Sequence, residues 1–545
     1  MQFWSSKSYY IACGAISPHL LCRHSDNNSR DGTGFNMRLA SLTFGLLSGL
    51  AASVTAPAAA FADPPKVLHI SLIQDPDILD PTLSGSYVGR IVFAGMCDKL
   101  FDFDPSLNIV PQLATGYTYK DPTHLIINLR PGVLFQDGEK LDANAVKYTL
   151  NRYLTMPGSL RRGEISVVQS VEVIDPLTVE LVLKAPDSAL LAQLADRAGI
   201  IIAPKAAATE GAKFGLHPVC AGPFSFVERV PEQKIVLKKF PGYWDAKDIH
   251  FDEVDYVPFV NSEVGVANLQ TGQLDMLTGM LPNDVATIKR DPKLRVVSQT
   301  SLANVGITFN VANGPASQSP IGQNASLRHA FELALDRTAL INVVYNGLYA
   351  PIAQANSPSS RFYVPSIVPP AMDLAAAQKL VAQSGVKTPI PVTLLVPNSP
   401  DFLQAAQVIQ AMEQPAGFDV KIQAMEFASS LATARAGNFQ AYLILWSGRA
   451  DADGNMYSFL HDGYGFNYGH YDNQQVDSLL DQARVAQSVT DRTALYAKVW
   501  GIERQDLPIL YLWSPTNIVG LKKTLLGFHP VPDGIVRLQG MRFAS

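Results

Sequence analysis

The chain has 545 residues, more than one ordinary hydrophobic core contains, so we expect two or three domains. Hydrophobic residues make up 47% and charged residues 17%, a composition typical of a folded globular protein. A formal charge of −5 and a pI near 6.1 give no electrostatic reason to expect nucleic acid or an anionic membrane as a partner. We interpret the short basic clusters Arg161-Arg162 and Lys238-Lys239 as solvated surface.

The N-terminal region predicts export. Residues 37–62 contain one early cation, an apolar run and the small-x-small sequence Ala60-Phe61-Ala62, which together are typical of a signal peptide. The apolar run is shorter than the ~20 residues that a spanning helix needs. We expect residues 1–36 to be an unstructured upstream extension, Asp63 to be the mature N-terminus and the periplasm to be the destination.

Two cysteines follow the predicted signal peptide, Cys97 and Cys220. An even pair in an oxidising compartment favours a disulfide. Two buried free thiols are the alternative, and the sequence spacing leaves both open.

Strand and helix patterns alternate along the rest of the chain and predict a mixed α/β or α+β fold. Helical spacing places Leu327, Ala330 and Phe331 on one face, with Ser326 as the expected N-cap, and a second helix is expected from Asp336 to Gly347. A proline-rich loop is predicted for residues 351–370 and an apolar helix stripe for 476–483. The predicted strands are 67–73, 123–130, 178–184 and 234–240.

The sequence lacks the common catalytic motifs. The sequence contains no G-x-S-x-G, H-E-x-x-H or Walker motif. His461 and His470 could form a metal corner, but histidines in a loop rich in tyrosine and glycine are more often surface residues. Asp451 and Asp453 could serve as an acid and a base, yet no nucleophile lies near them in the sequence. We therefore predict no metal, no cofactor and no catalysis, and expect capture of a small molecule between domains.

Several longer segments carry a resemblance to a known family. Residues 79–152 include "PQLATGY" and "INLRPGVLFQDGEKLDANAVKYTL", and "AGPFSF" (221–226), "FPGYWDA" (240–246) and "SLRHAFELALDRTALINVVYNG" (326–347) follow in the same order. In these segments the chain resembles the periplasmic solute-binding proteins that deliver peptides, nickel chelates and related solutes to ABC importers.

The resemblance implies a two-lobed periplasmic binding protein fold with an extra subdomain in lobe one and a two-segment hinge. The hinge would cross near Ser301-Leu302-Ala303 and near Leu512-Trp513. Cys97 and Cys220 would flank the junction of the subdomain with lobe one, which favours the disulfide. The implied boundaries are 63–95, 216–302 and 514–545 for lobe one, 96–215 for the subdomain and 303–513 for lobe two.

Ligand contacts are implied at two places. In relatives, the loop after "LDP" faces the cleft, which makes Gly85, Ser86 and Tyr87 candidates, because small residues admit a ligand and a tyrosine offers a stacking face. Packing inside the protein is the other interpretation of the tyrosine. The second place begins at Trp446, in "WSGRADADGN" (446–455).

In peptide-binding relatives, the third residue after this tryptophan is an aspartate that holds the α-ammonium of the peptide. Here the position is Arg449, followed by Asp451 and Asp453. The arginine repels an ammonium group and offers a planar fork to a carboxylate or phosphate. Either it faces the cleft and binds an anionic group, or it pairs with Asp451 or Asp453 and braces the loop, so that one aspartate could still anchor an ammonium group.

The resulting prediction is a monomeric extracytoplasmic binding protein that captures a peptide or peptide-like solute. The permease and ATPase would be separate chains, because the sequence has neither membrane spans nor a nucleotide loop. One alternative is a non-peptide anionic or metal-chelate solute, such as a nickel or haem compound. From another class, an exported metal-dependent hydrolase would use Asp451 and Asp453 with a metal at His461 or His470.

Overall fold

The computed structural model describes residues 64–259 and 261–544. The predicted upstream extension and signal peptide lie outside the described residues. Within the described ranges, no helix is both long and apolar enough to cross a membrane.

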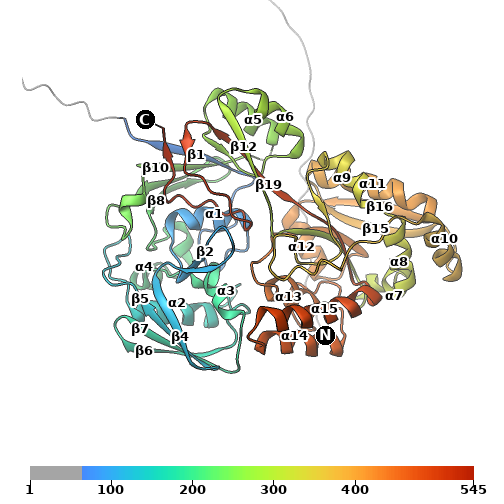
Figure 1. Ribbon diagram of the computed structural model, residues 1–545, viewed down its shortest axis with the longest axis horizontal. Coiled ribbons are helices and arrows are strands. Elements are labelled where there is room, and N and C mark those ends of the chain that lie inside the picture. The colour runs from blue at the N-terminus through green and yellow to red at the C-terminus, as the bar shows by residue number, and fades with distance from the viewer. Residues whose placement is uncertain (1–63, 260, 545) are drawn as a thin grey trace, which may run out of the picture. The chain divides into compact units, whose positions relative to one another are not determined.

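The structure has two bodies, the first formed by residues 64–96, 224–259, 261–300 and 516–544 and the second by residues 304–514 (Figure 1). The first body is built on a seven-stranded sheet in the order β12-β19-β11-β1-β10-β9-β8. The strand β1 lies parallel to β10 and β11, and the other pairings are antiparallel. The helix α1 (Tyr87–Met96) buries most of its residues in the core of this body. The strand bounds are Val67–Leu72 (β1), Phe224–Val230 (β8), Lys234–Lys239 (β9), Glu253–Pro258 (β10), Met276–Leu277 (β11), Leu294–Thr300 (β12) and Thr516–Lys522 (β19).

An insertion between α1 and β8 has a sheet of its own, in the order β4-β5-β7-β6. The helix α2 (Ala143–Thr155) packs on this sheet through Val146 and Leu150, and Asp142 caps its first turn as a carboxylate should. The remaining elements are β2 (Phe101–Phe103), β3 (Ile109–Pro111), β4 (Ala114–Asp121), β5 (His124–Leu129), β6 (Val168–Asp175), β7 (Thr178–Leu183), α3 (Leu190–Leu194), η1 (Arg197–Gly199), α4 (Pro204–Glu210) and η2 (Gly211–Leu216).

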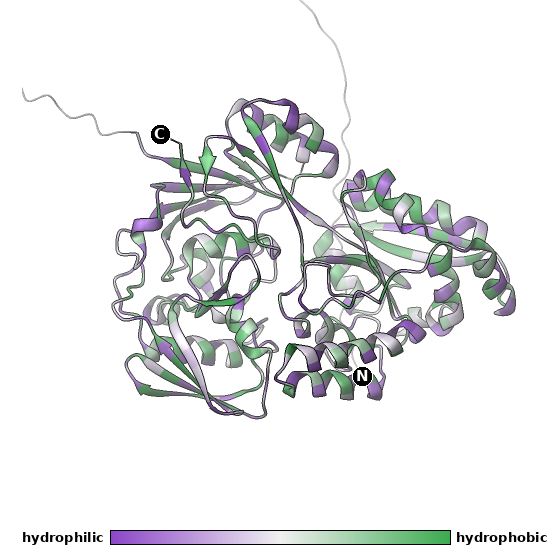
Figure 2. Cartoon of the chain, in the orientation of Figure 1, coloured by the Kyte–Doolittle hydropathy of each residue, from purple (hydrophilic) through white to green (hydrophobic). Residues whose placement is uncertain are grey.

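The second body contains a six-stranded sheet in the order β14-β18-β13-β17-β15-β16. Most of its helices carry both hydrophobic and hydrophilic residues, as expected when one face is buried (Figure 2). Its elements are β13 (Asn304–Phe309), β14 (Ala350–Pro351), β15 (Ile390–Pro397), β16 (Phe418–Met425), β17 (Ala441–Trp446), β18 (Ile509–Ser514), α7 (Pro320–Gln323), α8 (Ala325–Ala334), α9 (Arg337–Tyr345), α10 (Leu374–Gln383), α11 (Pro400–Glu413), α12 (Phe427–Arg435), α13 (Asp453–Leu460), α14 (Gln474–Val485) and α15 (Val489–Asp506).

The chain passes between the two large sheets at residues 301–303 and again at Pro515. Both the amide and the hydroxyl of Ser301 donate to the Pro515 carbonyl, at 3.1 and 2.7 Å, so the two crossings are hydrogen-bonded to each other. The second crossing lies at Pro515, two residues after the predicted Leu512-Trp513, because both of these residues lie inside β18, where their apolar side chains are buried.

The mixed α/β class and the four predicted strands are confirmed. The predicted cap Ser326 is wrong: Asn324 caps α8 and accepts a bond from the Ser326 amide. The Asn324 side chain can take this role because its backbone is extended, whereas Ser326 is already inside the first turn. Asp336 caps α9 as expected, and its helix ends at Asn346 in the left-handed conformation.

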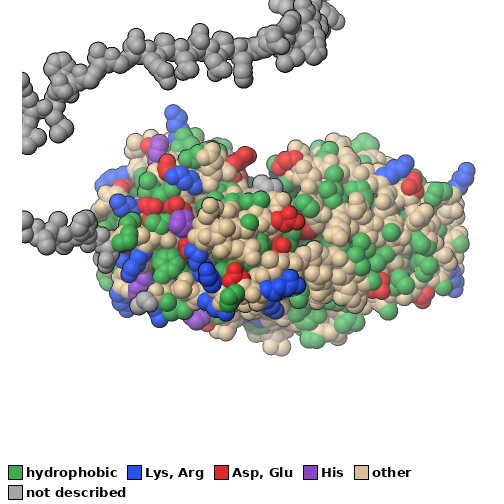
Figure 3. Space-filling view, turned by 90° about the horizontal axis from the view of Figure 1, so that it is seen from above, with side chains coloured by type: hydrophobic (Ala, Val, Ile, Leu, Met, Phe, Trp, Pro, Cys, Tyr) green, Lys and Arg blue, Asp and Glu red, His purple; other side chains and the backbone are tan. Residues whose placement is uncertain are grey.

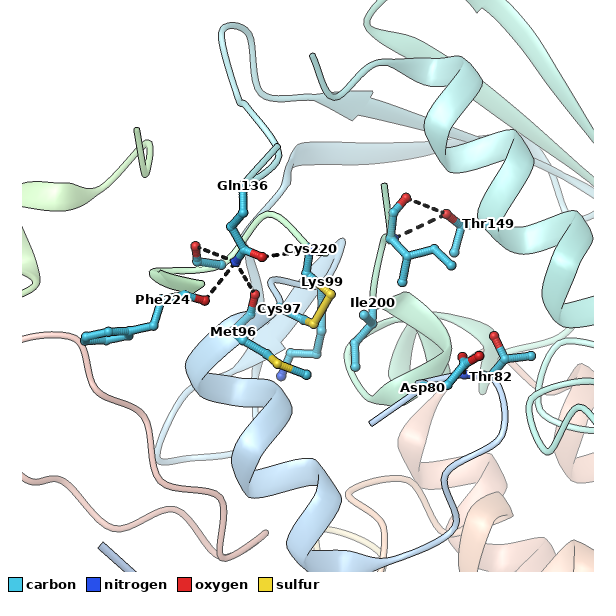
Figure 4. The surroundings of a disulfide bond; sticks show 12 residues. Asp80, Thr82, Met96, Cys97, Lys99, Gln136, Thr149, Ile200, Cys220 and Phe224 are labelled. Atoms are coloured by element: carbon cyan, nitrogen blue, oxygen red, sulfur yellow. Dashed lines mark hydrogen bonds between the residues drawn. A yellow bond between two sulfur atoms is a disulfide. The ribbon is translucent and has the colours of Figure 1, made fainter. Parts of the chain in front are cut away.

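The structure contains a disulfide between Cys97 and Cys220, where the insertion joins the first body (Figure 4). Gln136 holds the same junction, because its amide nitrogen donates to the carbonyls of Met96 and Phe224, at 2.7 and 2.8 Å. Its amide oxygen accepts from the Cys220 backbone at 2.9 Å. The two ends of the insertion are therefore tied together both covalently and by hydrogen bonds.

Acidic and basic side chains are intermingled on the face of the molecule shown in Figure 3. This distribution agrees with the small net charge and gives that face no broad field of one sign.

Candidate functional site

The segment 446–455 leaves the end of β17 and enters α13. Asn455 organises it: its side-chain oxygen accepts from the Trp446 indole at 3.0 Å and from the Arg449 amide at 2.7 Å. The Trp446 ring also packs against Phe459 and Phe466, with centroids 4.9 and 5.2 Å away. These contacts fix the position from which Arg449 projects.

The two predicted aspartates are already paired within the second body. Asp451 accepts a bidentate bond from Arg492, including one of 2.7 Å, and Asp453 does the same from Arg484 at 2.7 and 3.0 Å. The prediction that Arg449 braces the loop by pairing with either aspartate is therefore wrong. Because each carboxylate is matched by a guanidinium, the contacts also count against an ammonium anchor at these positions.

Arg449 instead reaches the insertion. Its Nε lies 3.4 Å from Oδ2 of Asp196, its Nη1 donates to the Gly448 carbonyl at 2.7 Å, and its guanidinium lies 4.4 Å from the Trp446 ring centroid. Burial is the main reason that the pKa of Arg449 falls to about 10. The side chain therefore joins the second body to the insertion.

Asp196 precedes η1 and is shared by two arginines. Arg90 in α1 grips it bidentately at 3.0 and 2.9 Å, and the Arg197 amide donates to it at 2.8 Å. Burial alone would raise its pKa, but Arg90 and Arg449 hold the pKa of Asp196 far below its usual range. The carboxylate is charged at any physiological pH.

Arg161 and Arg197 complete the group. Arg161 is only 2% exposed, so the prediction that it lies on the solvated surface is wrong. Its neighbour Arg162 is exposed, as predicted. Arg161 donates to Glu164 at 2.8 Å and to the Ser84 carbonyl at 3.2 Å. Arg197 donates to the same carbonyl at 3.4 Å.

We call Arg90, Arg161, Arg197 and Arg449 the arginine cluster. Its carboxylate partners are Asp196 and Glu164, so the cluster has more guanidinium groups than carboxylates. Among the described residues, Arg197 forms no ion pair, and its Nε has no hydrogen-bond partner. Burial and the charges of Arg161 and Arg449 hold the pKa of Arg197 well below its usual range. An anion would relieve this repulsion.

A cavity of about 20 Å³ beside the cluster is lined by Arg90, Asp196 and Arg197. This volume suits a single water molecule. A larger surface groove, of about 540 Å³, lies between α2 and α4 and does not include the cluster.

The other predicted site is Gly85 to Tyr87. It directly follows Ser84, whose carbonyl accepts from Arg161 and Arg197 of the cluster. Asp77 holds the loop by accepting from the Gly85 amide at 2.6 Å and from both the amide and hydroxyl of Ser86. The Tyr87 hydroxyl donates to the Gly534 carbonyl at 2.9 Å. These three residues have structural contacts, and solute contacts by them stay a prediction.

His461 and His470, the candidate metal ligands, do not belong to a group of three potential ligands in the described residues. His461 stacks on Tyr457 at 4.5 Å between centroids and its Nδ1 lies 3.9 Å from Asp477, while His470 is exposed. In the part of the chain that the structure describes, no group of three potential metal ligands occurs.

Sequence reasoning did not identify Arg90, Asp196 or Arg197. One signal was available: the adjacent charges Asp196-Arg197 interrupt the stretch 189–203, which is apolar apart from Gln193. Charged residues in an apolar segment are buried only when they are paired or bind something.

The chain is similar to known proteins along most of its length. Residues 108–467 match the family model described as bacterial extracellular solute-binding proteins, family 5. A glutathione-binding protein from Pectobacterium atrosepticum is 28% identical over 84% of this chain and 90% of its own length. Among solved structures, the binding protein AgaA from A. tumefaciens R10, in complex with agropinic acid, is 26% identical with a TM-score of 0.78, covering 88% of this chain and 99% of that one. The periplasmic binding protein DppA from Helicobacter pylori, in complex with the peptide STSA, is 24% identical with a TM-score of 0.79, covering 88% and 98%.

Proposed function

Because the chain belongs to the bacterial extracellular solute-binding proteins of family 5, we propose that it captures a peptide-like solute and presents it to a separate ABC permease and ATPase. The predicted lobes, 63–95 with 216–302 and 514–545, the insertion 96–215, and 303–513, are the moving parts in this proposal. Export by the signal peptide 37–62 would place the protein in the periplasm.

The observation that carries the proposal is the ion pair between Arg449 and Asp196, which joins parts of the chain connected by two short crossings. A second contact supports it: the Ser188 amide of the insertion donates to the Arg484 carbonyl of α14 at 2.8 Å. Contacts of this kind form when two bodies close and break when they open. A solute that binds between the bodies would shift this equilibrium toward closure.

The small-solute character also has support from the relatives. One relative is named as a glutathione-binding protein, and two similar structures hold agropinic acid and the peptide STSA. We propose a solute of this size and no catalytic turnover.

Isothermal titration calorimetry and thermal unfolding of the purified protein, with glutathione and a panel of di- to tetrapeptides, test the proposal. A bound solute at a hundred times its Kd should stabilise the protein by about 2.7 kcal/mol. Small-angle scattering should show a smaller radius of gyration with that solute present.

Mass spectrometry of peptides incubated with the protein tests whether the protein cleaves them. Cleavage products that require the protein would contradict a binding role and favour the hydrolase alternative. N-terminal sequencing of exported protein should give Asp63, and retention of residues 37–62 would contradict the export signal.

A further inference from the structure

The arginine cluster directs two guanidinium groups at one backbone oxygen. Nη2 of Arg161 and Nη1 of Arg197 lie 3.2 and 3.4 Å from the Ser84 carbonyl oxygen. A neutral carbonyl is a weaker hydrogen-bond acceptor for a guanidinium group than a carboxylate is, because charge-assisted hydrogen bonds are about twice as strong as neutral ones. The two forks therefore face a point where an anion would bind better.

The neighbouring charges do not balance the cluster. Lys99 and Arg537 lie close by, but they are matched by Asp102 and Asp533, with contacts of 2.6 to 2.9 Å. Glu164 is matched to Arg161, and the single charge of Asp196 is shared by Arg90 and Arg449, so the excess positive charge lies on Arg197 and Arg449. Leaving a buried charge without a partner is costly, so the arrangement is hard to explain as scaffold alone.

We propose that Arg161, Arg197 and Arg449 form a binding site for a carboxylate group of the solute. The inference rests on the proposed solute-binding function and narrows the solute to an anionic one. A guanidinium is planar and presents paired donors that match the two oxygens of a carboxylate. The incoming carboxylate takes the place of the Ser84 carbonyl as acceptor for Arg161 and Arg197.

The site couples binding to closure. Arg161 and Arg197 belong to the insertion, whereas Arg449 belongs to the second body and already lies near Asp196. A carboxylate held by the first two arginines adds a negative charge beside Asp196 and so attracts Arg449 more strongly. An anionic solute therefore stabilises the closed arrangement more than a neutral solute of the same shape.

The test uses glutarate and its neutral analogue glutaramide as probes, with calorimetry and thermal unfolding of the full chain. Glutarate should stabilise the wild type and glutaramide should not. Arg197→Leu and Arg161→Leu should each weaken glutarate at least about tenfold, the loss expected for one charge-assisted bond. Arg162→Leu is the matched control, since it removes an exposed cation from the adjacent position and should keep the glutarate affinity within about twofold.

The melting temperature in the absence of glutarate and glutaramide is a second measurement. If Arg197 were only structural, its substitution would not raise this temperature. Arg197→Leu should raise it, because the substitution removes a buried charge that has no ion-pair partner among the described residues. Arg537→Leu should lower it, because that arginine bonds both Asp102 and Asp533.

Three results overturn the carboxylate site: a wild type that does not respond to glutarate, a glutarate response that survives both substitutions, or a lower melting temperature for Arg197→Leu. If glutarate binds as described while no peptide in the panel does, the carboxylate site stands and the peptide-like solute is wrong.

Discussion

Substituting Asp196 by Asn should destabilise the protein strongly at neutral pH. The carboxylate accepts two bonds from Arg90 and lies 3.4 Å from Nε of Arg449, all in a buried environment. Asparagine keeps the shape and one acceptor, so the bond from the Arg197 amide can survive, but it removes the charge. Removing one partner of a buried ion pair costs about 3–5 kcal/mol, and we expect a loss in that range.

The assay is urea unfolding at pH 7, followed by circular dichroism, with Asp419→Asn as control because Asp419 is an exposed carboxylate 3.7 Å from Lys421. The control should change the free energy of unfolding by less than about 0.5 kcal/mol. Because the folded-state pKa of Asp196 is depressed, its stabilising contribution is present above the ordinary Asp value and is lost only as pH falls below it. The difference between wild type and Asp196→Asn should therefore be constant from pH 5 to 8. A difference under about 1 kcal/mol, or one that varies across this interval, would refute the charge argument.

Three further predictions concern other parts of the molecule. Removing the Cys97–Cys220 disulfide by double serine substitution should cost up to about 4–5 kcal/mol, because the bond closes a loop with a sequence separation of 123 residues; a melting temperature equal to that of the oxidised wild type would contradict this. Glu413 is fully buried, and burial raises its pKa. Above the ordinary Glu value the unfolded state has lost a proton that the folded state keeps, so the free energy of unfolding falls as pH rises. Glu413→Gln should therefore unfold at a higher urea concentration at pH 8 and should reduce the decrease of the unfolding free energy with pH; an unchanged decrease would count against this prediction. Gly448→Ala should lower stability by more than about 1 kcal/mol, since Gly448 has a φ of +73° and an added Cβ would lie 2.1 Å from the Leu302 carbonyl oxygen; an unchanged urea midpoint would contradict this.

Much of the fold follows from local patterns in the sequence. The alternating strand at residues 67–73 and the capped helix after Asp336 are visible because period and capping are local properties. The sequence places the second crossing two to three residues early, because Leu512 and Trp513 are apolar whether they end a strand or link two sheets. The pairing of β18 with β13 and β14 decides between the two.

The candidate site was less predictable. The sequence drew attention to Arg449, but the partner it finds is Asp196, more than two hundred residues away in the chain. The basic pair Arg161-Arg162 is typical of protein surface, whereas the burial of Arg161 depends on tertiary contacts with Ser84 and Glu164. Long-range ion pairs leave no periodic signal in a sequence.

The contrast between neighbouring ion pairs supports a functional role for the cluster. In the second body, Asp451 with Arg492 and Asp453 with Arg484 are complete bidentate pairs. In the cluster, Asp196 serves both Arg90 and Arg449, and the Arg197 side chain donates to the Ser84 carbonyl without an ion-pair partner among the described residues. The cluster therefore differs from these two sites in having more guanidinium groups than carboxylates, which is the feature that the proposed carboxylate of a solute would compensate.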